Sequence, residues 1–224
     1  MPRYLTAEEK KERYDLIFNN AVEMFDESSY GEITMSNLAK KCDIAKGTIF
    51  KYFKTKETLF SLILYSEYDK WVQEETMELE KYREFSCDSF IEFTTNRTKT
   101  IFSKHLRLVR LIAIKRTILD KNIDINIYAS EVKKFQRQMK NVAAIAAGKT
   151  EGISTEDMFE FYQAWHISVA GSYNLGVSKL NKRRLGEINL SELAAFNIEA
   201  VVINCVRRYL RGLFFKKRGI YGKI

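Results

Sequence analysis

Residues 33–59 read ITMSNLAKKCDIAKGTIFKYFKTKETL and hold two short helical patterns separated by a tight turn. Thr34 is placed to cap a first helix, which we expect to end where residues 42–45 interrupt its pattern. A second helix is expected over residues 46–53, and Thr55 is placed to cap a longer helix that follows. Two short helices that meet at a tight turn, beside a longer helix, are typical of a helix-turn-helix motif.

Helical patterns continue on both sides of this motif. Thr6 and Glu9 form a capping-box pattern at the start of an amphipathic helix over about residues 7–28, and Ser86 is placed to cap a later one. The helices expected after the motif cover about residues 55–81, 86–103, 105–119, 123–148, 155–181 and 189–211. The sequence therefore predicts an all-α fold of about nine helices, with an N-terminal three-helix domain and a C-terminal helical domain.

The composition favours long helices and argues against a β-sandwich or a barrel. The 224 residues include one proline, Pro2, and ten glycines, and neither residue type occurs between Thr48 and Ala147. Because glycine and proline mark most turns and strand ends, their absence favours uninterrupted helices. We divide the chain into a helix-turn-helix domain at residues 1–65, with its motif at about 33–53, and a second domain at residues 66–224.

Several classes of function are not supported by the residues. The three cysteines, Cys42, Cys87 and Cys205, form no CxxC pair and the chain has two histidines, so we expect no metal and no cofactor. No nucleophile–base pair, carboxylate dyad or Gly-rich phosphate loop can be assembled, so we expect no enzyme. No apolar signal segment or membrane-spanning stretch is present, and we therefore expect a cytoplasmic protein with no membrane partner.

The positive charge of the chain, +8 overall, is unevenly distributed. Acidic residues dominate about residues 8–32, whereas six lysines between Lys40 and Lys56 are accompanied by one acid, Asp43. A basic cluster on a helical scaffold is what a phosphate-backbone partner requires. The alternative is a solvated charged surface, and charge alone does not decide between the two.

Residues of about 10–65 resemble the DNA-binding domain of the TetR family of bacterial transcriptional repressors. The resemblance rests on residues 33–59, which combine a Thr cap, a Leu-Ala pair, a turn, a Lys-Gly-Thr helix start, an aromatic pair and a Lys-Glu-x-Leu segment. Three positions depart from the family pattern: Asp43 replaces the usual Gly of the turn, Ala45 a Ser or Thr cap, and Phe50 a Tyr. The rest of the chain resembles the family's helical regulatory domain in length and layout only.

The resemblance implies a set of contacts with double-stranded DNA. Phosphates would be bound by Thr34, Thr48, Tyr52 and Lys56, and the residues near base edges would be Ser36, Lys46, Gly47, Phe50 and Lys51. For Phe50 and Tyr52 the alternative is packing against the first helix. For Lys40, Lys41 and Lys54 we favour solvent exposure over DNA contact.

The resemblance also implies a homodimer that pairs the last two helices with those of a second copy. Small and apolar residues give these helices faces suited to close approach, although part of them must fill the subunit's own core. The residues expected at the interface are Ala164, Ser168, Gly171, Ser172, Leu175, Leu193, Phe196, Ala200, Val201 and Asn204.

Aromatic residues with a few polar groups among them predict a pocket for a small-molecule effector. The residues expected to line it are Phe135, Phe161, Tyr162, Trp165, His166, Tyr173 and Asn174. The alternative is plain core, because aromatic stripes at helical spacing usually fill a protein interior.

The sequence therefore predicts a DNA-binding transcriptional regulator, a repressor that binds a palindromic operator as a homodimer and is released by a small-molecule effector of unknown identity. Two alternatives remain. One is a DNA-binding regulator controlled by a protein partner, and the other is an all-helical binding or scaffold protein without DNA function. Salt-dependent DNA binding separates the last from the others.

Overall fold

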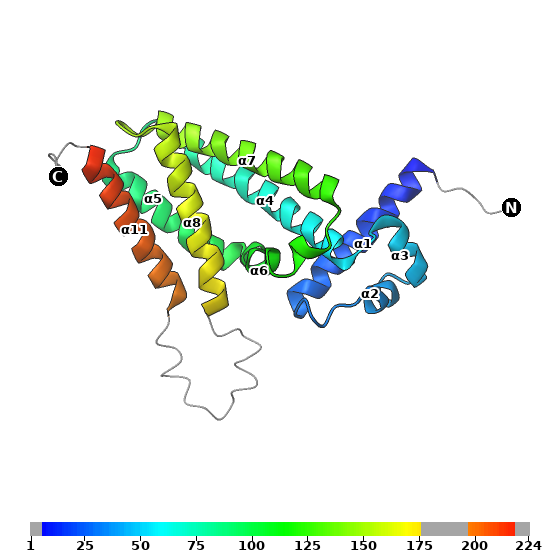
Figure 1. The fold of residues 1–224 in the computed structure, drawn as a ribbon. Coiled ribbons are helices and arrows are strands. Elements are labelled where there is room, and N and C mark those ends of the chain that lie inside the picture. Colours follow the sequence, from blue (N-terminus) through cyan, green and yellow to red (C-terminus); the bar gives the residue numbers. More distant parts are fainter. Residues whose placement is uncertain (1–5, 176–196, 218–224) are drawn as a thin grey trace, which may run out of the picture. The chain divides into compact units, whose positions relative to one another are not determined.

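The computed structural model describes residues 6–175 and 197–217, and for residues 174, 175 and 217 it describes the backbone alone. Over these ranges the protein has nine α-helices, one turn of 3-10 helix and no strand, in agreement with the predicted all-α fold (Figure 1). The elements are α1 (Ala7–Glu27), α2 (Met35–Lys41), α3 (Lys46–Tyr52), α4 (Lys56–Glu80), α5 (Cys87–Lys104), α6 (Leu106–Lys115), η1 (Leu119–Lys121), α7 (Ile125–Gly148), α8 (Thr155–Leu175) and α11 (Ile198–Lys217). Among the described helices, none combines the length and apolar character that crossing a membrane requires.

The helices begin at the side chains that the sequence predicts as caps. Thr6 and Glu9 form a complete capping box at α1, with the Glu9 amide donating to the Thr6 hydroxyl over 3.1 Å. Thr34 accepts from the amide of Asn37 at the start of α2, and the Asn37 side chain accepts from the amide of Thr34. Ser86 accepts from a backbone amide in the first turn of α5. Each cap satisfies an amide that the helix itself leaves without an acceptor.

The chain divides into two compact units. The first comprises Met1–Glu67 and Ile114–Glu131, and the second comprises Tyr68–Ala113 and Val132–Ile224. The domain boundary that we expect near residue 65 stays a prediction.

The first unit packs α1, α2 and α3 around a small apolar core. Ile17 of α1, Leu38 of α2 and Ile49 of α3 are completely buried, and so is Phe53 at the end of α3. The ring of Phe53 lies 4.8 Å from the ring of Tyr14, centroid to centroid, so aromatic packing joins the end of α3 to α1. These side chains form a small apolar core that fixes α3 against α1 and α2.

In the second unit α11 packs against both α5 and α8 (Figure 1). Phe90 of α5, Phe161 of α8 and Phe214 of α11 are buried together, with the ring of Phe90 6.2 Å from that of Phe161 and 6.3 Å from that of Phe214. Aromatic packing therefore holds these three helices against one another.

Two helix ends differ from the prediction. The helix expected over residues 105–119 ends at Lys115, and η1 follows it, with Leu119 completely buried. The last helix was expected to end near Arg211 but continues to Lys217, because Leu210 and Phe214 keep its buried face in the core. The start of this helix near residue 189 was predicted wrongly: α11 begins at Ile198, because Asn197 is not helical and its side chain accepts from the amide of Ala200 as a cap. Residues 189–196 and the predicted end of α8 lie outside the described residues.

Candidate functional site

Helix α3 presents one face to solvent and buries the other. Ile49 is completely buried, whereas Lys46, Gly47 and Lys51 are exposed and Phe50 is 41% exposed. Exposure of Phe50 disfavours the alternative in which it packs against the first helix. The outward face thus carries two lysines and an aromatic ring on a helix fixed by its buried side.

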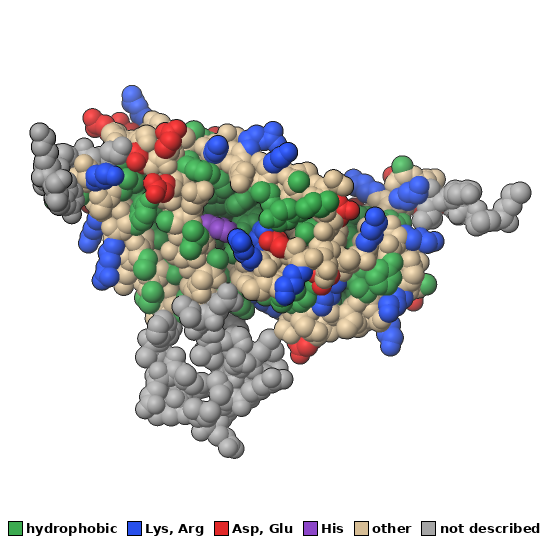
Figure 2. All heavy atoms as spheres, in the orientation of Figure 1, with side chains coloured by type: hydrophobic (Ala, Val, Ile, Leu, Met, Phe, Trp, Pro, Cys, Tyr) green, Lys and Arg blue, Asp and Glu red, His purple; other side chains and the backbone are tan. Residues whose placement is uncertain are grey.

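The other residues predicted to contact DNA also reach the surface of the first unit. Thr34 is exposed, and Ser36, Thr48, Tyr52 and Lys56 are partly exposed. In Figure 2, Lys and Arg side chains lie over the region of α1 to α3, with apolar side chains between them. The arrangement is compatible with a surface that binds phosphates around a central reading helix.

The lysines for which we favour solvent exposure behave in different ways. Lys40 and Lys54 are exposed, as expected. Lys41 forms an ion pair with Glu23 of α1, with Nζ 3.0 Å from the carboxylate oxygen. Exposed pairs of this kind contribute at most about 1 kcal/mol to stability, so this one does not determine how α2 packs on α1.

The turn between α2 and α3 depends on Asp43. Its φ angle is +52°, the single positive value among the described non-glycine residues. This is the left-handed conformation in which glycine is usual, and aspartate accepts it more readily than most residues. Ala45 occupies the cap position before Lys46, the first residue of α3, and its side chain forms no capping hydrogen bond. Both departures from the family pattern are therefore accommodated locally.

Lys56 differs from the other predicted DNA contacts because its ammonium group has partners inside the protein. Nζ donates to the backbone carbonyls of Tyr30 and Ile33, each over 2.7 Å. It also lies 3.7 Å from the centre of the Tyr30 ring. Burial lowers the pKa of Lys56, with the charge of Glu57 opposing that shift.

The second unit contains a small apolar cavity between helices α4, α5, α6 and α8. It is lined by Tyr68, Trp71, Ile101, Leu108, Ile112, Trp165, His166 and Val169. Its volume is about 10 Å³, which accommodates about one water molecule. A larger ligand would therefore require the surrounding side chains to move.

Three of the lining residues, Tyr68, His166 and Trp165, carry polar groups, but the wall of the cavity itself is apolar. The hydroxyl of Tyr68 lies 2.6 Å from Nε2 of His166, and the ring of Phe135 packs 4.1 Å from that of Tyr68. The indole N–H of Trp165 is buried and has no hydrogen-bond partner among the described residues. A buried donor without an acceptor is costly, so a movement that opened the cavity toward this N–H would allow a ligand or a water to supply one.

The predicted pocket residues occupy several different places. Trp165 and His166 line the cavity, and Phe135 lies beside it. Phe161 and Tyr162 are buried in the core, and Tyr173 is partly exposed. The side chain of Asn174 lies outside the described residues, so the predicted pocket stays a prediction.

The sequence-based prediction missed the contributions of Tyr68 and Trp71. Both lie on α4, where apolar residues at helical spacing mark a buried face but do not identify the helix that packs against it. The ring of Trp71 lies 5.5 Å from that of Trp165, although the two residues are far apart in the sequence.

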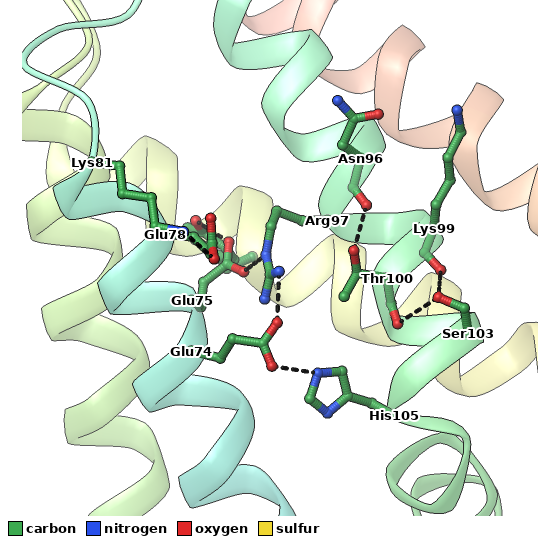
Figure 3. A network of polar contacts seen from close by, with 11 residues as sticks. Glu74, Glu75, Glu78, Lys81, Asn96, Arg97, Lys99, Thr100, Ser103 and His105 are labelled. Atoms are coloured by element: carbon green, nitrogen blue, oxygen red, sulfur yellow. Dashed lines mark hydrogen bonds and ion pairs between the residues drawn. The ribbon is translucent and has the colours of Figure 1, made fainter.

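In the second unit, a largely buried network of charged and polar side chains is centred on Arg97 (Figure 3). Nε of Arg97 lies 2.7 Å from Glu75, and Nη1 lies 2.9 Å from Glu74, whose other oxygen lies 2.9 Å from His105. Tyr162 donates its hydroxyl to the second oxygen of Glu75 over 3.2 Å. Burial raises the pKa of Glu75, with Arg97 opposing it. All four hydrogen bonds lie within the second unit, so the network holds α4, α5 and α8 together.

The faces predicted to form a dimer are partly exposed. Val201 is 47% exposed, Gly171 and Asn204 are exposed, and Ala164, Ser168 and Ala200 are partly exposed. Ser172 is buried and donates its hydroxyl to a carbonyl of its own helix. Leu193, Phe196 and the side chain of Leu175 lie outside the described residues.

The prediction did not include Ile167, although its side chain is 69% exposed on α8. It lies one helical turn from Ala164 and from Gly171, on the same side of the helix. Its spacing could have identified it, since residues four apart share a helix face.

Comparison with known families places residues 17–63 in the family described as "Bacterial regulatory proteins, tetR family". This match confirms the resemblance inferred from residues 33–59. The HTH-type transcriptional regulator YuxN of Bacillus subtilis is 37% identical over 60 residues, which are 27% of this chain and 21% of that protein. The negative transcriptional regulator IcaR of the icaADBC biofilm operon of Staphylococcus aureus is 21% identical over 186 residues, which are 81% of this chain and 97% of that protein.

Solved structures share the fold over nearly the whole chain. A TetR transcriptional regulator from Rhodococcus sp. RHA1 superposes with a TM-score of 0.55 and 16% identity, over 91% of this chain and 96% of that one. The fatty acid degradation regulator FadR from Bacillus halodurans gives a TM-score of 0.51 and 14% identity, over 93% and 96% of the two chains. At such identities the likeness establishes the fold and no more.

Proposed function

We propose that this chain, which belongs to the TetR family of bacterial regulatory proteins through its helix-turn-helix domain, represses transcription by binding a palindromic operator as a homodimer. The observation that carries the proposal is the outward face of α3, where Lys46, Gly47, Phe50 and Lys51 stand exposed on a helix anchored by Ile49. A recognition helix needs this combination of a fixed buried side and a free polar side to enter the major groove.

The proposed roles separate phosphate contacts from base contacts. Thr34 caps α2, and Thr48 and Tyr52 lie on α3; all three carry hydroxyl groups that can donate to phosphate oxygens. Lys46 and Lys51 carry donors that suit the acceptor atoms of guanine in the major groove. The hydroxyl groups would fix orientation, and the lysines would contribute sequence preference.

The proposed dimer joins α8 and α11 to the same helices of a second copy. Exposed Ile167 and Val201 are large apolar side chains, and a Cβ added at Gly171 would meet no atom of the described residues within 4 Å. The space beside Gly171 would allow a second helix to approach closely. Pairing gives two recognition helices, and a palindromic site is read by such a pair.

The proposed effector is a small molecule with aromatic or apolar character that enters the cavity beside Trp165 and His166. Support comes from the aromatic lining and from the buried Trp165 N–H, which has no acceptor among residues 6–175 and 197–217. Release of DNA requires the ligand to bind the DNA-free state more tightly, with a coupling of typically about 1–3 kcal/mol.

The DNA-binding proposal is tested by titrating the purified chain with an operator selected from random DNA, over a range of salt concentrations. We expect affinity to fall with salt, and Lys46→Ala to cost about 1–3 kcal/mol per half-site on operator with much less loss on random DNA. Lys99→Ala, which removes an exposed lysine of α5, is the matched control. Equal losses for the two variants, or no salt-dependent binding at all, would contradict the proposal.

Tryptophan fluorescence can report on binding of an effector in the cavity. Trp71 and Trp165 are the two tryptophans of the chain, and both line the cavity. A small molecule that lowers operator affinity should therefore change tryptophan fluorescence, and Trp165→Phe should weaken its binding. A DNA-releasing molecule whose affinity is the same for the Trp165→Phe variant would place the effector elsewhere.

A further inference from the structure

The ammonium group of Lys56 is occupied by the segment that leads into α2. Nζ is 2.7 Å from the carbonyl oxygen of Tyr30 and 2.7 Å from that of Ile33, so two of its three N–H groups already have acceptors. The Tyr30 ring lies under the same group, with its centre 3.7 Å from Nζ. The side chain therefore closes a contact between the start of α4 and a segment more than twenty residues earlier.

The surroundings of Lys56 are built to hold this contact. The hydroxyl of Tyr30 donates to Glu57 over 3.0 Å, which fixes the ring in place. Burial lowers the pKa of Lys56, whereas the neighbouring charge of Glu57 favours the ammonium form. Hydrogen bonds from an ammonium group to neutral carbonyls are stronger than those between neutral groups, so two of them restrain the segment.

The restrained segment determines how α2 begins. Ile33 is 1% exposed, and the next residue is Thr34, the cap of α2. The side-chain amide of Asn37 also holds this segment: its NH2 group donates to the carbonyl of Glu32, and its oxygen accepts from the backbone amide of Thr34. Lys56 and Asn37 thus bind the carbonyls of neighbouring residues, and both side chains restrain the segment that precedes α2.

We propose that Lys56 acts in DNA binding as a positioning residue, which orients the start of α2 through the carbonyls of Tyr30 and Ile33, and not as a phosphate ligand. The inference rests on the proposed DNA-binding function. It differs from what the family resemblance implies, because a phosphate ligand needs a charge directed to solvent. Here the charge is directed inward to two carbonyls and a ring.

The two roles predict different salt dependences. A phosphate ligand releases counterions, so its removal from both subunits of a dimer flattens the log–log salt dependence of binding by roughly two units. A positioning residue makes no such contact. Lys56→Met should therefore weaken operator binding about tenfold at every salt concentration and leave the slope unchanged. The matched control is Lys54→Met, which removes an exposed lysine two residues away. In a hydrogen-exchange measurement, this variant should leave the amides of residues 31–38 as protected as in the unmodified chain.

A second measurement uses the free protein and does not depend on DNA. Lys56→Met should accelerate hydrogen exchange of the amides in residues 31–38, because the segment loses its restraint. Tyr30→Leu should do the same to a smaller extent, and Tyr30→Phe, which keeps a ring under Nζ but loses the bond to Glu57, should accelerate exchange less than Tyr30→Leu. The tyrosine pair keeps the test informative if Lys56→Met folds poorly.

The outcomes separate the two proposals. A slope reduced by about two units in Lys56→Met, with unchanged exchange in residues 31–38, would overturn the positioning role and leave DNA binding intact. Absence of salt-dependent DNA binding by the unmodified chain would overturn the proposed function, and with it any role of Lys56 in DNA binding. Faster exchange with an unchanged slope supports the inference.

Discussion

The amide of Ile44 donates to the carbonyl of Ala39 over 3.1 Å, which closes the end of α2 across the turn. A second bond runs from the amide of Asp43 to the carbonyl of Lys40 over 3.2 Å. With Asp43 at φ +52°, the two bonds form a Schellman motif, the usual way in which a helix ends at a left-handed residue. The path of the chain from α2 into α3 therefore depends on the conformation of one aspartate.

Asp43→Val should destabilise the protein by about 1–2 kcal/mol, because a β-branched side chain is strained in the left-handed conformation. Asp43→Asn should change the free energy of unfolding by less than about 0.5 kcal/mol, since asparagine accepts that conformation equally well. Thermal or denaturant unfolding of the two variants measures the difference. Equal stability of the valine and asparagine variants would mean that the turn adopts another conformation.

Gly47→Ala should have opposite effects on the stability of α3 and on operator affinity. Within residues 6–175 and 197–217, no atom lies within 4 Å of a Cβ at this position, so alanine should stabilise α3 by up to about 1 kcal/mol. If α3 lies against base edges, the added methyl group should nevertheless lower operator affinity. Gly212→Ala in α11 is the control, since its Cβ is equally unobstructed and the residue is not among the predicted DNA contacts. Operator affinity unchanged in Gly47→Ala would show that the backbone of α3 does not approach DNA.

Gly171→Arg should convert the protein to a monomer with weak operator binding. Gly171 is exposed and a Cβ there meets no atom of the described part of the chain within 4 Å, so the fold should be retained, but the arginine would occupy the space that a second copy of α8 requires. Light scattering measures the mass. Gly148→Arg, at the exposed end of α7, is a control that should stay dimeric. A Gly171→Arg protein that remains dimeric would place the interface on another face.

Glu74 should make the stability of the protein sensitive to acid. Burial alone would raise its pKa, but the contacts with Arg97 and His105 outweigh burial and hold the pKa of Glu74 below its ordinary value. Because the folded-state pKa is the lower one, the contribution is complete above the unfolded pKa, about 4.3, and is lost as the pH falls through the folded pKa.

Glu74→Gln should therefore reduce the free energy of unfolding at pH 7, by an amount on the order of 1 kcal/mol because the carboxylate is partly exposed, and by less at pH 3. Denaturant unfolding at the two pH values gives the comparison. Glu78→Gln removes a carboxylate whose partner, Lys81, lies at the surface, and it should have a smaller effect at either pH. A Glu74→Gln effect that grows toward low pH would reverse the sign of the proposed contribution.

The sequence predicts the helix starts well because each start depends on residues close together in the chain. Thr6, Thr34 and Ser86 all cap through an amide three residues later, so the sequence pattern contains the whole interaction. Helix ends were less predictable. Whether α6 stops at Lys115, or α11 continues to Lys217, depends on packing partners such as those of Leu119 and Phe214, which are distant in sequence.

The same distinction applies to the candidate sites. For α3 the family resemblance implies that Lys46 and Lys51 lie near base edges, and their exposure agrees with it. The sequence leaves open whether Phe50 packs against the first helix, and its exposure disfavours that alternative. The internal contacts of Lys56 could not be predicted, because its acceptors are backbone carbonyls, which leave no trace in the identity of side chains. The cavity likewise combines Trp71 with Trp165, and no local pattern pairs two helices so far apart.

The buried guanidinium of Arg97 also determines how far α5 can slide along α4. An interface made of aliphatic side chains would accept a shift of one helical turn, about 5.4 Å, with similar contacts on either side. The same shift here would separate Arg97 from Glu75 and leave the buried carboxylate without its cation, with the Tyr162 hydroxyl as its remaining partner, at a cost of up to about 3–5 kcal/mol. The ion pair therefore fixes the register of α5 on α4, which apolar packing alone would leave less well defined.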